Sequence, residues 1–276
     1  MRIGLLGPLD VSSQGAEIRI QAALQRSLLA ALAVRAGDVV PVDSLAKAIW
    51  DARPPATWTV TLRNYVRRLR LAFGPDNQDR IVTRPPGYLL RVDRGDIDLF
   101  AFENFRKAGM AAARAADWRL ASAKFGEAES LWRGTPFADV PSRPITDTHV
   151  PYLQEARLAV QEARLHADLQ LSPLNAASVA PELQRLAMLH PAREHLRLLL
   201  MLALYRSGRQ SDALAAYREA WQFSTSELGT EPGPALKAMH QRMLAGDPGL
   251  RQPGVFADDA YASLAFLVAI RPRYGR

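Results

Sequence analysis

The chain has 276 residues, of which 48% are hydrophobic, and a formal net charge of +7. This length favours two domains of ordinary size, and the hydrophobic share is enough for packed cores rather than disorder. The absence of cysteine excludes disulfide frameworks, thiolate metal sites and cysteine nucleophiles. No stretch reaches the ~18 apolar residues of a membrane span, and the first residues lack the pattern of a secretory signal. We therefore expect a cytoplasmic protein with no membrane partner.

The first fifty residues alternate short extended pieces with short helices. Apolar clusters between turn residues favour strands, and leucines at helical spacing favour helices. Gly37 stops the first helix, and Asp43 or Ser44 can cap the second. The predicted elements are strands at 2–7 and 17–20 around a turn at 12–15, a helix at 22–36, an extended piece at 39–42 and a helix at 45–50.

Residues 56–73 are predicted to form a long helix with a basic face. Its apolar residues recur at three- and four-residue steps, so they share one side of the helix: Leu62, Tyr65, Val66, Leu69 and Phe73. The polar residues off that stripe are Arg63, Asn64, Arg67, Arg68 and Arg70. Residues 57–94 carry eight arginines against three aspartates, so the positive charge is concentrated here. The alternative is a solvent-facing helix with no ligand.

Residues 81–92 are predicted to form two short strands around Pro85-Pro86-Gly87, a sequence that can turn but cannot continue a ladder. Arg84 and Arg91 make this hairpin basic as well. A basic helix followed directly by a basic hairpin can place one element in a DNA groove and the other along the neighbouring backbone. The pair therefore indicates binding to nucleic acid.

This order of strands, helix, short helix, long basic helix and hairpin resembles the winged helix-turn-helix domain of OmpR-type response regulators. The matching segments are 28–32, 42–50, 66–70 and 84–88. The resemblance implies that the long helix enters the major groove and that the wing follows the adjacent backbone or minor groove. The family usually has glycine where this chain has Pro85, so the contacts of the wing tip do not carry over.

The basic residues divide into two groups by their place on the helix and wing. Arg63 and Arg67 are one turn apart and Asn64 is adjacent, so these three are the candidate base readers. The candidate phosphate contacts are Arg68, Arg70, Arg84 and Arg91. A solvated charge is the alternative at each position. Tyr88 is expected to pack under the wing.

The loop 51–57 between the second and third helices is flanked by tryptophans. The resemblance makes this loop a candidate contact for RNA polymerase, including its sigma factor. The residues concerned are Trp50, Asp51, Arg53 and Trp58. Both tryptophans can equally belong to the core.

A polar stretch at 93–98 marks the predicted end of the first domain, after which the chain becomes alanine-rich and helical. Helices are predicted at 99–116, 117–132, 147–171, 180–189, 193–207, 211–228 and 234–244, with no strand after Phe102. Small residues at helical spacing, with Gly208 between two helices, follow the pattern of tetratricopeptide repeats in irregular form. His190 and His195 flank a helix start, where we expect caps or surface residues.

Residues 190–221 and 227–244 closely resemble the bacterial transcriptional activator domain, including its closing turn Glu231-Pro232-Gly233-Pro234. An OmpR-type domain followed by this domain defines the Streptomyces antibiotic regulatory protein family, here in its small stand-alone form. The expected fold class is an α+β winged helix-turn-helix at 1–96 followed by an all-α tetratricopeptide-like domain at 99–245. For the extension at 246–276, a docked helix, a dimer contact and a poorly ordered tail all stay open.

The resemblance implies a sequence-specific activator that binds direct repeats near promoters of an antibiotic or other secondary-metabolite gene cluster. It would act on the nucleoid as a homodimer on double-stranded DNA and recruit RNA polymerase. No Walker A, GxGxxG or GxSxG pattern occurs and the five histidines form no metal set, so we expect no enzyme, cofactor or metal. The alternatives are a helical-repeat interaction or signalling module, and a repressor with the same DNA-binding domain. A small-molecule effector is left open.

Overall fold

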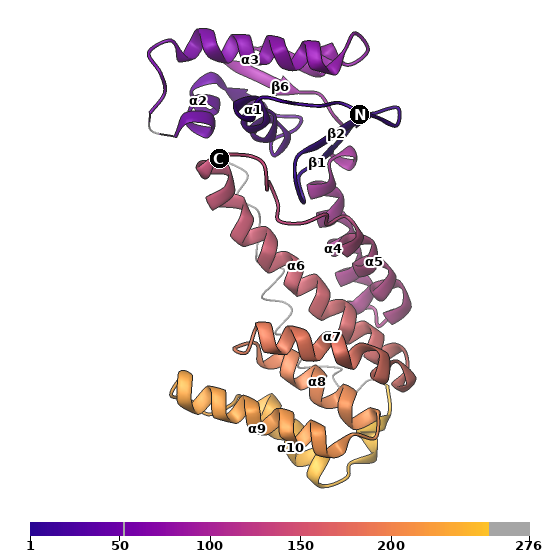
Figure 1. Ribbon diagram of the computed structural model, residues 1–276. Coiled ribbons are helices and arrows are strands. Elements are labelled where there is room, and N and C mark those ends of the chain that lie inside the picture. The colour runs from indigo at the N-terminus through magenta and orange to yellow at the C-terminus, as the bar shows by residue number, and fades with distance from the viewer. Residues whose placement is uncertain (52, 254–276) are drawn as a thin grey trace. The chain divides into compact units, whose positions relative to one another are not determined.

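The computed structural model describes residues 1–51 and 53–253 of the chain. These residues form two compact units, and the division does not follow a single cut in the sequence. The first unit contains Met1–Arg106 and Glu127–Arg157, and the second contains Lys107–Gly126 and the described residues from 158 onward. Every strand of the described chain lies in the first unit (Figure 1).

The N-terminal sheet is an antiparallel meander of β1 (Arg2–Gly4), β2 (Asp10–Ser13) and β3 (Ala16–Glu17). Ile3 pairs with Val11 and both side chains are buried. Gln14 and Gly15 have φ of +52° and +84°, the backbone of a two-residue hairpin turn. The turn is therefore shorter than predicted, and β2 takes up the first half of the segment expected to turn. The strand expected at 17–20 is observed as the two-residue strand β3, which ends at Glu17.

Three helices and a second sheet form the winged helix-turn-helix, which confirms the predicted class. Its elements are α1 (Ala23–Ala33), β4 (Val39–Pro41), α2 (Val42–Trp50), α3 (Trp58–Phe73), the 3-10 helix η1 (Gln78–Arg80), β5 (Ile81–Arg84) and β6 (Gly87–Leu90). Strand β6 pairs with β4 and β5, antiparallel to both, so the wing is the β5–β6 hairpin. Helix α2 begins directly after Pro41 without a side-chain cap, so the capping predicted for Asp43 or Ser44 is wrong.

The wing depends on a glycine at the start of β6. A Cβ at Gly87 would lie 1.8 Å from the carbonyl oxygen of Val40, so only glycine lets β6 pass this close to β4. The next side chain, Tyr88, is buried beneath the wing, as predicted. Gly87 therefore allows the close approach of β6 to β4, and Tyr88, the next residue, contributes its ring to the core.

The first unit extends beyond the predicted boundary at residue 96 because Asp98 closes the end of β1. Its two carboxylate oxygens accept hydrogen bonds from the backbone N–H groups of Leu5 (2.7 Å) and Leu6 (3.0 Å). Burial raises the pKa of Asp98, against the lowering effect of these bonds and of Arg133. Ile3 also forms an isolated bridge with Ile97. The N-terminal sheet is therefore completed by residues that follow the winged helix in sequence.

Helices make up most of the remaining described chain, and no described residue after Phe102 lies in a strand. The α-helices are α4 (Asp98–Arg114), α5 (Trp118–Ser130), α6 (Arg143–Leu171), α7 (Ala176–Leu189), α8 (Glu194–Arg206), α9 (Gln210–Glu227) and α10 (Pro234–Leu244). The 3-10 helices are η2 (Arg94–Asp96), η3 (Pro173–Asn175) and η4 (Pro248–Arg251). Helices α6 and α7 start four residues earlier than predicted, and each contains an internal proline, Pro151 and Pro181.

In the second unit, helix α8 is buried and packs against α7, α9 and α10 (Figure 1). Gly208 has φ of +78° in the turn between α8 and α9. Ala213, Ala216 and Ala220 form the buried side of α9, as small-residue packing predicts. Leu250 of η4 joins the same core, so the start of the 246–276 extension docks on this unit. The apolar segment 261–270 lies outside the described residues.

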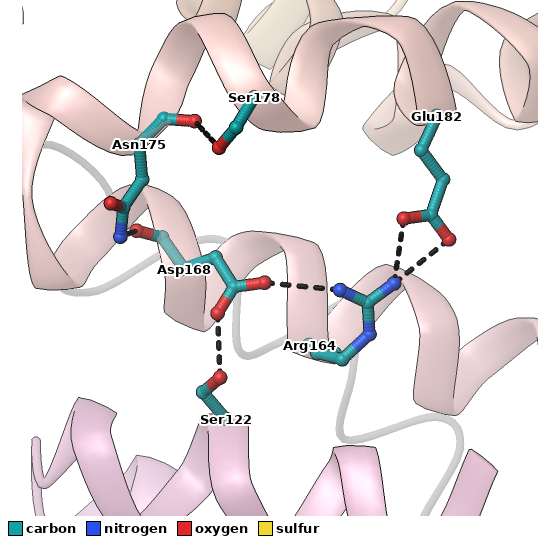
Figure 2. Close-up of polar contacts among 6 residues, drawn as sticks. All are labelled: Ser122, Arg164, Asp168, Asn175, Ser178 and Glu182. Carbon is teal, nitrogen blue, oxygen red and sulfur yellow. Dashed lines mark hydrogen bonds and ion pairs between the residues drawn. The ribbon is translucent and has the colours of Figure 1, made fainter. Parts of the chain in front are cut away.

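A polar network also joins α5, α6 and α7 (Figure 2). The Ser122 hydroxyl donates to Asp168 Oδ1 at 2.5 Å. Arg164 donates to Asp168 Oδ2 at 3.1 Å and to the two carboxylate oxygens of Glu182 at 2.8 and 2.7 Å. The Asn175 amide donates to the backbone carbonyl of Asp168 at 3.0 Å. These bonds fix the register of three consecutive helices at their mostly apolar contact.

Candidate nucleic-acid interface

Helix α3 has one buried side and one side directed away from the core. Leu62, Val66, Leu69 and Phe73 are buried, which confirms four of the five predicted stripe residues. Tyr65 is only half-buried, and its ring stacks on Trp50 of α2 at 6.0 Å between centroids. The buried stripe therefore fixes which side of α3 faces outward (Figure 1).

The outward side of α3 carries cations with no partner in the described part of the chain. Arg63, Asn64, Arg67 and Arg68 are all exposed. Their side chains make no hydrogen bond or ion pair with any described residue, and α3 itself contains no acidic residue. Exposed, unpaired guanidinium groups keep all their N–H donors available for phosphate or base edges. This is the arrangement expected of a surface that receives a polyanion.

Arg70 differs from the other arginines of α3 because it holds the wing. Its Nε donates to the carbonyl of Ile81 at 2.9 Å, and one terminal nitrogen donates to the Thr83 hydroxyl at 2.9 Å. Both acceptors belong to β5, so the guanidinium sets the position of the wing relative to the helix. From the sequence, only a phosphate contact was expected of Arg70, because the distance from α3 to β5 cannot be deduced from helical spacing.

The wing presents its own free charges. Arg84 ends β5 and is exposed together with Pro85 and Pro86 at the tip. Arg91 follows β6 and is exposed, while its backbone carbonyl accepts a bond from Arg80 at 3.4 Å. Neither the Arg84 nor the Arg91 side chain bonds to another described residue. Both are placed for the predicted contacts with a phosphate backbone.

The four residues predicted to contact polymerase lie in the α2–α3 loop and at its two ends. Asp51 and Arg53 are exposed, whereas Trp50 and Trp58 are half-buried. Asp51 has φ of +56°, a left-handed backbone that is unfavourable for a residue with a side chain. Asp51 and Trp58 also line a cavity of about 770 Å³, together with residues of α1, α2 and the first turns of α6. Trp50 thus packs against Tyr65, whereas Trp58 contributes to a concave surface.

A second charged cluster lies within the helical unit and is buried. Glu162 accepts from His195 Nδ1 at 2.5 Å and from Arg193 at 3.2 Å, and its side chain is 4% exposed. The expectation that His195 is a cap or surface residue is wrong, because α6 supplies this carboxylate beside it. The neighbouring His166 is buried, and its pKa is lowered to about 3 by burial and by the charges of His195 and Arg206. No group of described residues could hold a metal ion.

These features define a class of protein: a winged-helix transcriptional regulator in which the DNA-binding unit is followed by helical repeats. The family model described as "Transcriptional regulatory protein, C terminal", a DNA-binding domain, matches residues 17–90. The model described as "Bacterial transcriptional activator domain" matches residues 97–244, more than half of the chain. The chain belongs to the Streptomyces antibiotic regulatory protein family of transcriptional regulators.

Individual relatives agree with this assignment. The regulatory protein DnrI of Streptomyces peucetius is 37% identical over 262 residues, which cover 92% of this chain and 96% of DnrI. The regulatory protein AfsR of Streptomyces coelicolor is 37% identical over 266 residues, 96% of this chain but only 26% of AfsR. This chain therefore spans about a quarter of AfsR.

A solved structure shares the fold. The structure of Mycobacterium tuberculosis EmbR in complex with a low-affinity phosphopeptide matches with a TM-score of 0.85 and 32% identity. The match covers 97% of this chain and 69% of the EmbR chain. The family matches indicate a regulator rather than an enzyme. No helix among the described residues is long and apolar enough to cross a membrane.

Proposed function

We propose that the protein is a sequence-specific DNA-binding activator whose helix α3 enters the major groove of double-stranded DNA. The observation that carries this proposal is the outward side of α3, where four polar residues have no partner among residues 1–51 and 53–253 while Arg70 fixes the wing beside them. Arg63, Asn64 and Arg67 are the base readers in this proposal, and Arg68, Arg84 and Arg91 contact phosphates. Arg70 has donors left for a phosphate besides the two that hold β5.

We assign the DNA-binding domain to residues 1–96 and the activator domain to residues 99–245, which the family matches at 17–90 and 97–244 support. Family membership supports target sites made of direct repeats near promoters of an antibiotic or other secondary-metabolite gene cluster. Two copies of the chain would bind such repeats side by side, as a homodimer formed on DNA. Genome-wide mapping of bound DNA in the native host tests this part of the proposal, because it reveals the repeat spacing and the target genes together.

The second part of the proposal is that the α2–α3 loop holds RNA polymerase, including its sigma factor, at the promoter. The loop supports this role through exposed Asp51 and Arg53 beside a cavity that Trp58 also lines. Transcription from the target promoter with purified polymerase is expected to rise when the protein is added. A fall would assign the chain as a repressor, and failure to bind any DNA would favour a helical-repeat interaction module.

The strained backbone at Asp51 gives a clean test of the loop. Asp51→Gly relieves the unfavourable φ of +56° and is expected to leave stability unchanged or raise it by up to about 1 kcal/mol. If the Asp51 carboxylate contacts polymerase, the same variant binds operator DNA normally but activates transcription less than the wild type. Normal activation by Asp51→Gly would remove this carboxylate from the contact.

A further inference from the structure

The outward side of α3 includes an apolar position that the proposed base readers do not explain. Val60, Asn64, Arg67 and Leu71 follow one another at steps of four, three and four residues, so they form one line along the helix. This line runs opposite the buried stripe. Val60 is 56% exposed and Leu71 is 67% exposed, both on a helix whose other apolar residues largely face the core.

Arg67 belongs to this line, and the other arginines of α3 lie on its two flanks. Arg63 is seven residues from Arg70 and so shares its side of the helix, the side that holds β5. Arg68 is three residues from Tyr65 and lies toward the opposite side, where Tyr65 stacks on Trp50. In a groove, a line pointing directly away from the core lies nearest the base edges, while the flanks lie nearer the two phosphate backbones. The long side chain of Arg63 can still extend from its flank to a base edge. Val60 is therefore directed at the floor of the groove.

The floor of the major groove offers one prominent apolar group, the C5-methyl group of thymine. We propose that Val60 recognises a thymine by packing its two methyl groups against that C5-methyl group. Val60 is preferred over Leu71 because recognition helices contact bases mainly through their N-terminal residues, and Leu71 lies in the last turn. This inference rests on the proposed function, since it requires α3 to occupy the major groove.

The geometry also places the thymine relative to the base pair contacted by Asn64. Val60 and Asn64 are four residues apart, which is about 6 Å along the helix axis. Successive base pairs are separated by about 3.4 Å, so the thymine lies within about two base pairs of the Asn64 contact. A protein that reads a methyl group in this way distinguishes thymine from uracil, although the two bases pair identically.

The test uses the full chain and an operator selected from random duplex DNA by the wild-type protein. Each thymine of the selected operator is replaced in turn by deoxyuridine, which removes only the methyl group. The wild type is expected to lose about three- to tenfold in affinity at one thymine. Val60→Ala is expected to bind the unmodified operator with the same loss and to be insensitive to the replacement at that position.

Two further measurements make the result decisive. Cytosine at the same position should weaken wild-type binding, and 5-methylcytosine should restore part of it, because it returns a methyl group at the same place. Leu120→Ala is the control, since Leu120 is 45% exposed on α5 and should leave affinity and methyl sensitivity unchanged. Val60 is exposed, so circular dichroism should show a folded Val60→Ala variant with wild-type melting.

The outcomes separate this inference from the function on which it rests. If no operator is selected, the proposed DNA binding fails. If an operator is selected but the wild type and Val60→Ala respond equally to every deoxyuridine replacement, DNA binding stands and the assignment of Val60 is overturned. A single thymine at which only the wild type is sensitive establishes the assignment.

Discussion

The arginines of α3 and those of the helices α6 to α8 are the same residue type in opposite circumstances. In the second unit, Arg164 pairs with Asp168 and Glu182, and Arg206 donates to the backbone carbonyls of Leu169, Leu250 and Gln252. On α3, by contrast, Arg63, Arg67 and Arg68 are exposed and have no partner among the described residues. A paired arginine stabilises the fold, whereas an unpaired and solvated arginine is available to an external anion.

This contrast predicts that removing charges in the two regions has separate consequences. Substitutions in the buried clusters should reduce stability and leave the DNA contacts of the folded protein unchanged. Substitutions on α3 and the wing should weaken DNA binding and leave stability unchanged. Each of the following experiments is expected to show one of these effects without the other.

The largest effect is expected for Glu162→Ala. This change leaves Arg193 and His195 beside an empty position in a buried site, and the loss of one partner of such a cluster costs about 3–5 kcal/mol of unfolding free energy. Urea unfolding of the wild type and the variant measures this loss of unfolding free energy. The control is Asp212→Ala, which breaks an ion pair with Arg209 that is roughly half-exposed on both sides and should cost under about 1 kcal/mol. Equal losses for both variants would contradict the distinction between buried and surface charges.

Arg67→Ala should have the opposite profile. If Arg67 reads a base, the variant loses about 1–3 kcal/mol of operator binding and relaxes the sequence preference at one position. Its unfolding free energy should change by less than about 0.5 kcal/mol, because Arg67 is exposed and pairs with no residue that the structure describes. The matched control is Arg119→Ala, another exposed arginine on α5. Operator affinity equal to that of the wild type would remove Arg67 from the base readers.

The stability of the second unit should fall in mild acid because of His166. Its pKa is about 3 in the folded protein and 6.5 for the unperturbed side chain, so between these values only the unfolded chain takes up a proton. Stability from this group is complete above pH 6.5 and decreases as the pH falls toward 3. From pH 7 to pH 5 the expected loss is about 2 kcal/mol. His166→Gln should unfold with a flatter pH dependence; an unchanged slope would mean that His166 is not the group responsible.

The smallest effect is expected at the wing. Arg84→Ala and Arg91→Ala should each weaken binding by about 1 kcal/mol, equally for specific and non-specific DNA, because phosphate contacts carry no sequence information. Each variant should also reduce the slope of log affinity against log salt concentration by about 0.9. A titration series in increasing salt measures both quantities. A change in sequence preference without a change in slope would instead place these arginines on base edges.

Much of the architecture could be predicted because it depends on periodic patterns. The three- and four-residue spacing of Leu62, Val66 and Leu69 fixed the buried side of α3, and therefore the outward side as well. Pro85-Pro86-Gly87 fixed the position of the wing turn, since these residues cannot continue a ladder. The long helices after residue 97 followed from the same periodicity, with errors of one to four residues at their ends.

The remaining features could not be predicted because they join residues far apart in sequence. Asp98 completes the N-terminal sheet through Leu5 and Leu6, and no local pattern marks that contact. The same holds for Glu162, which makes His195 a largely buried partner where the sequence indicated a cap or a surface residue.

The sequence by itself determined the order of the elements, the basic character of α3 and the wing, and the family to which the chain belongs. Only the tertiary structure decided which arginines are free and which are held in the fold. That distinction depends on whether a carboxylate or carbonyl from another element comes within hydrogen-bond distance of the guanidinium. Arg70 shows this most clearly: its spacing places it with the other basic residues of α3, and the proximity of β5 makes it the residue that positions the wing.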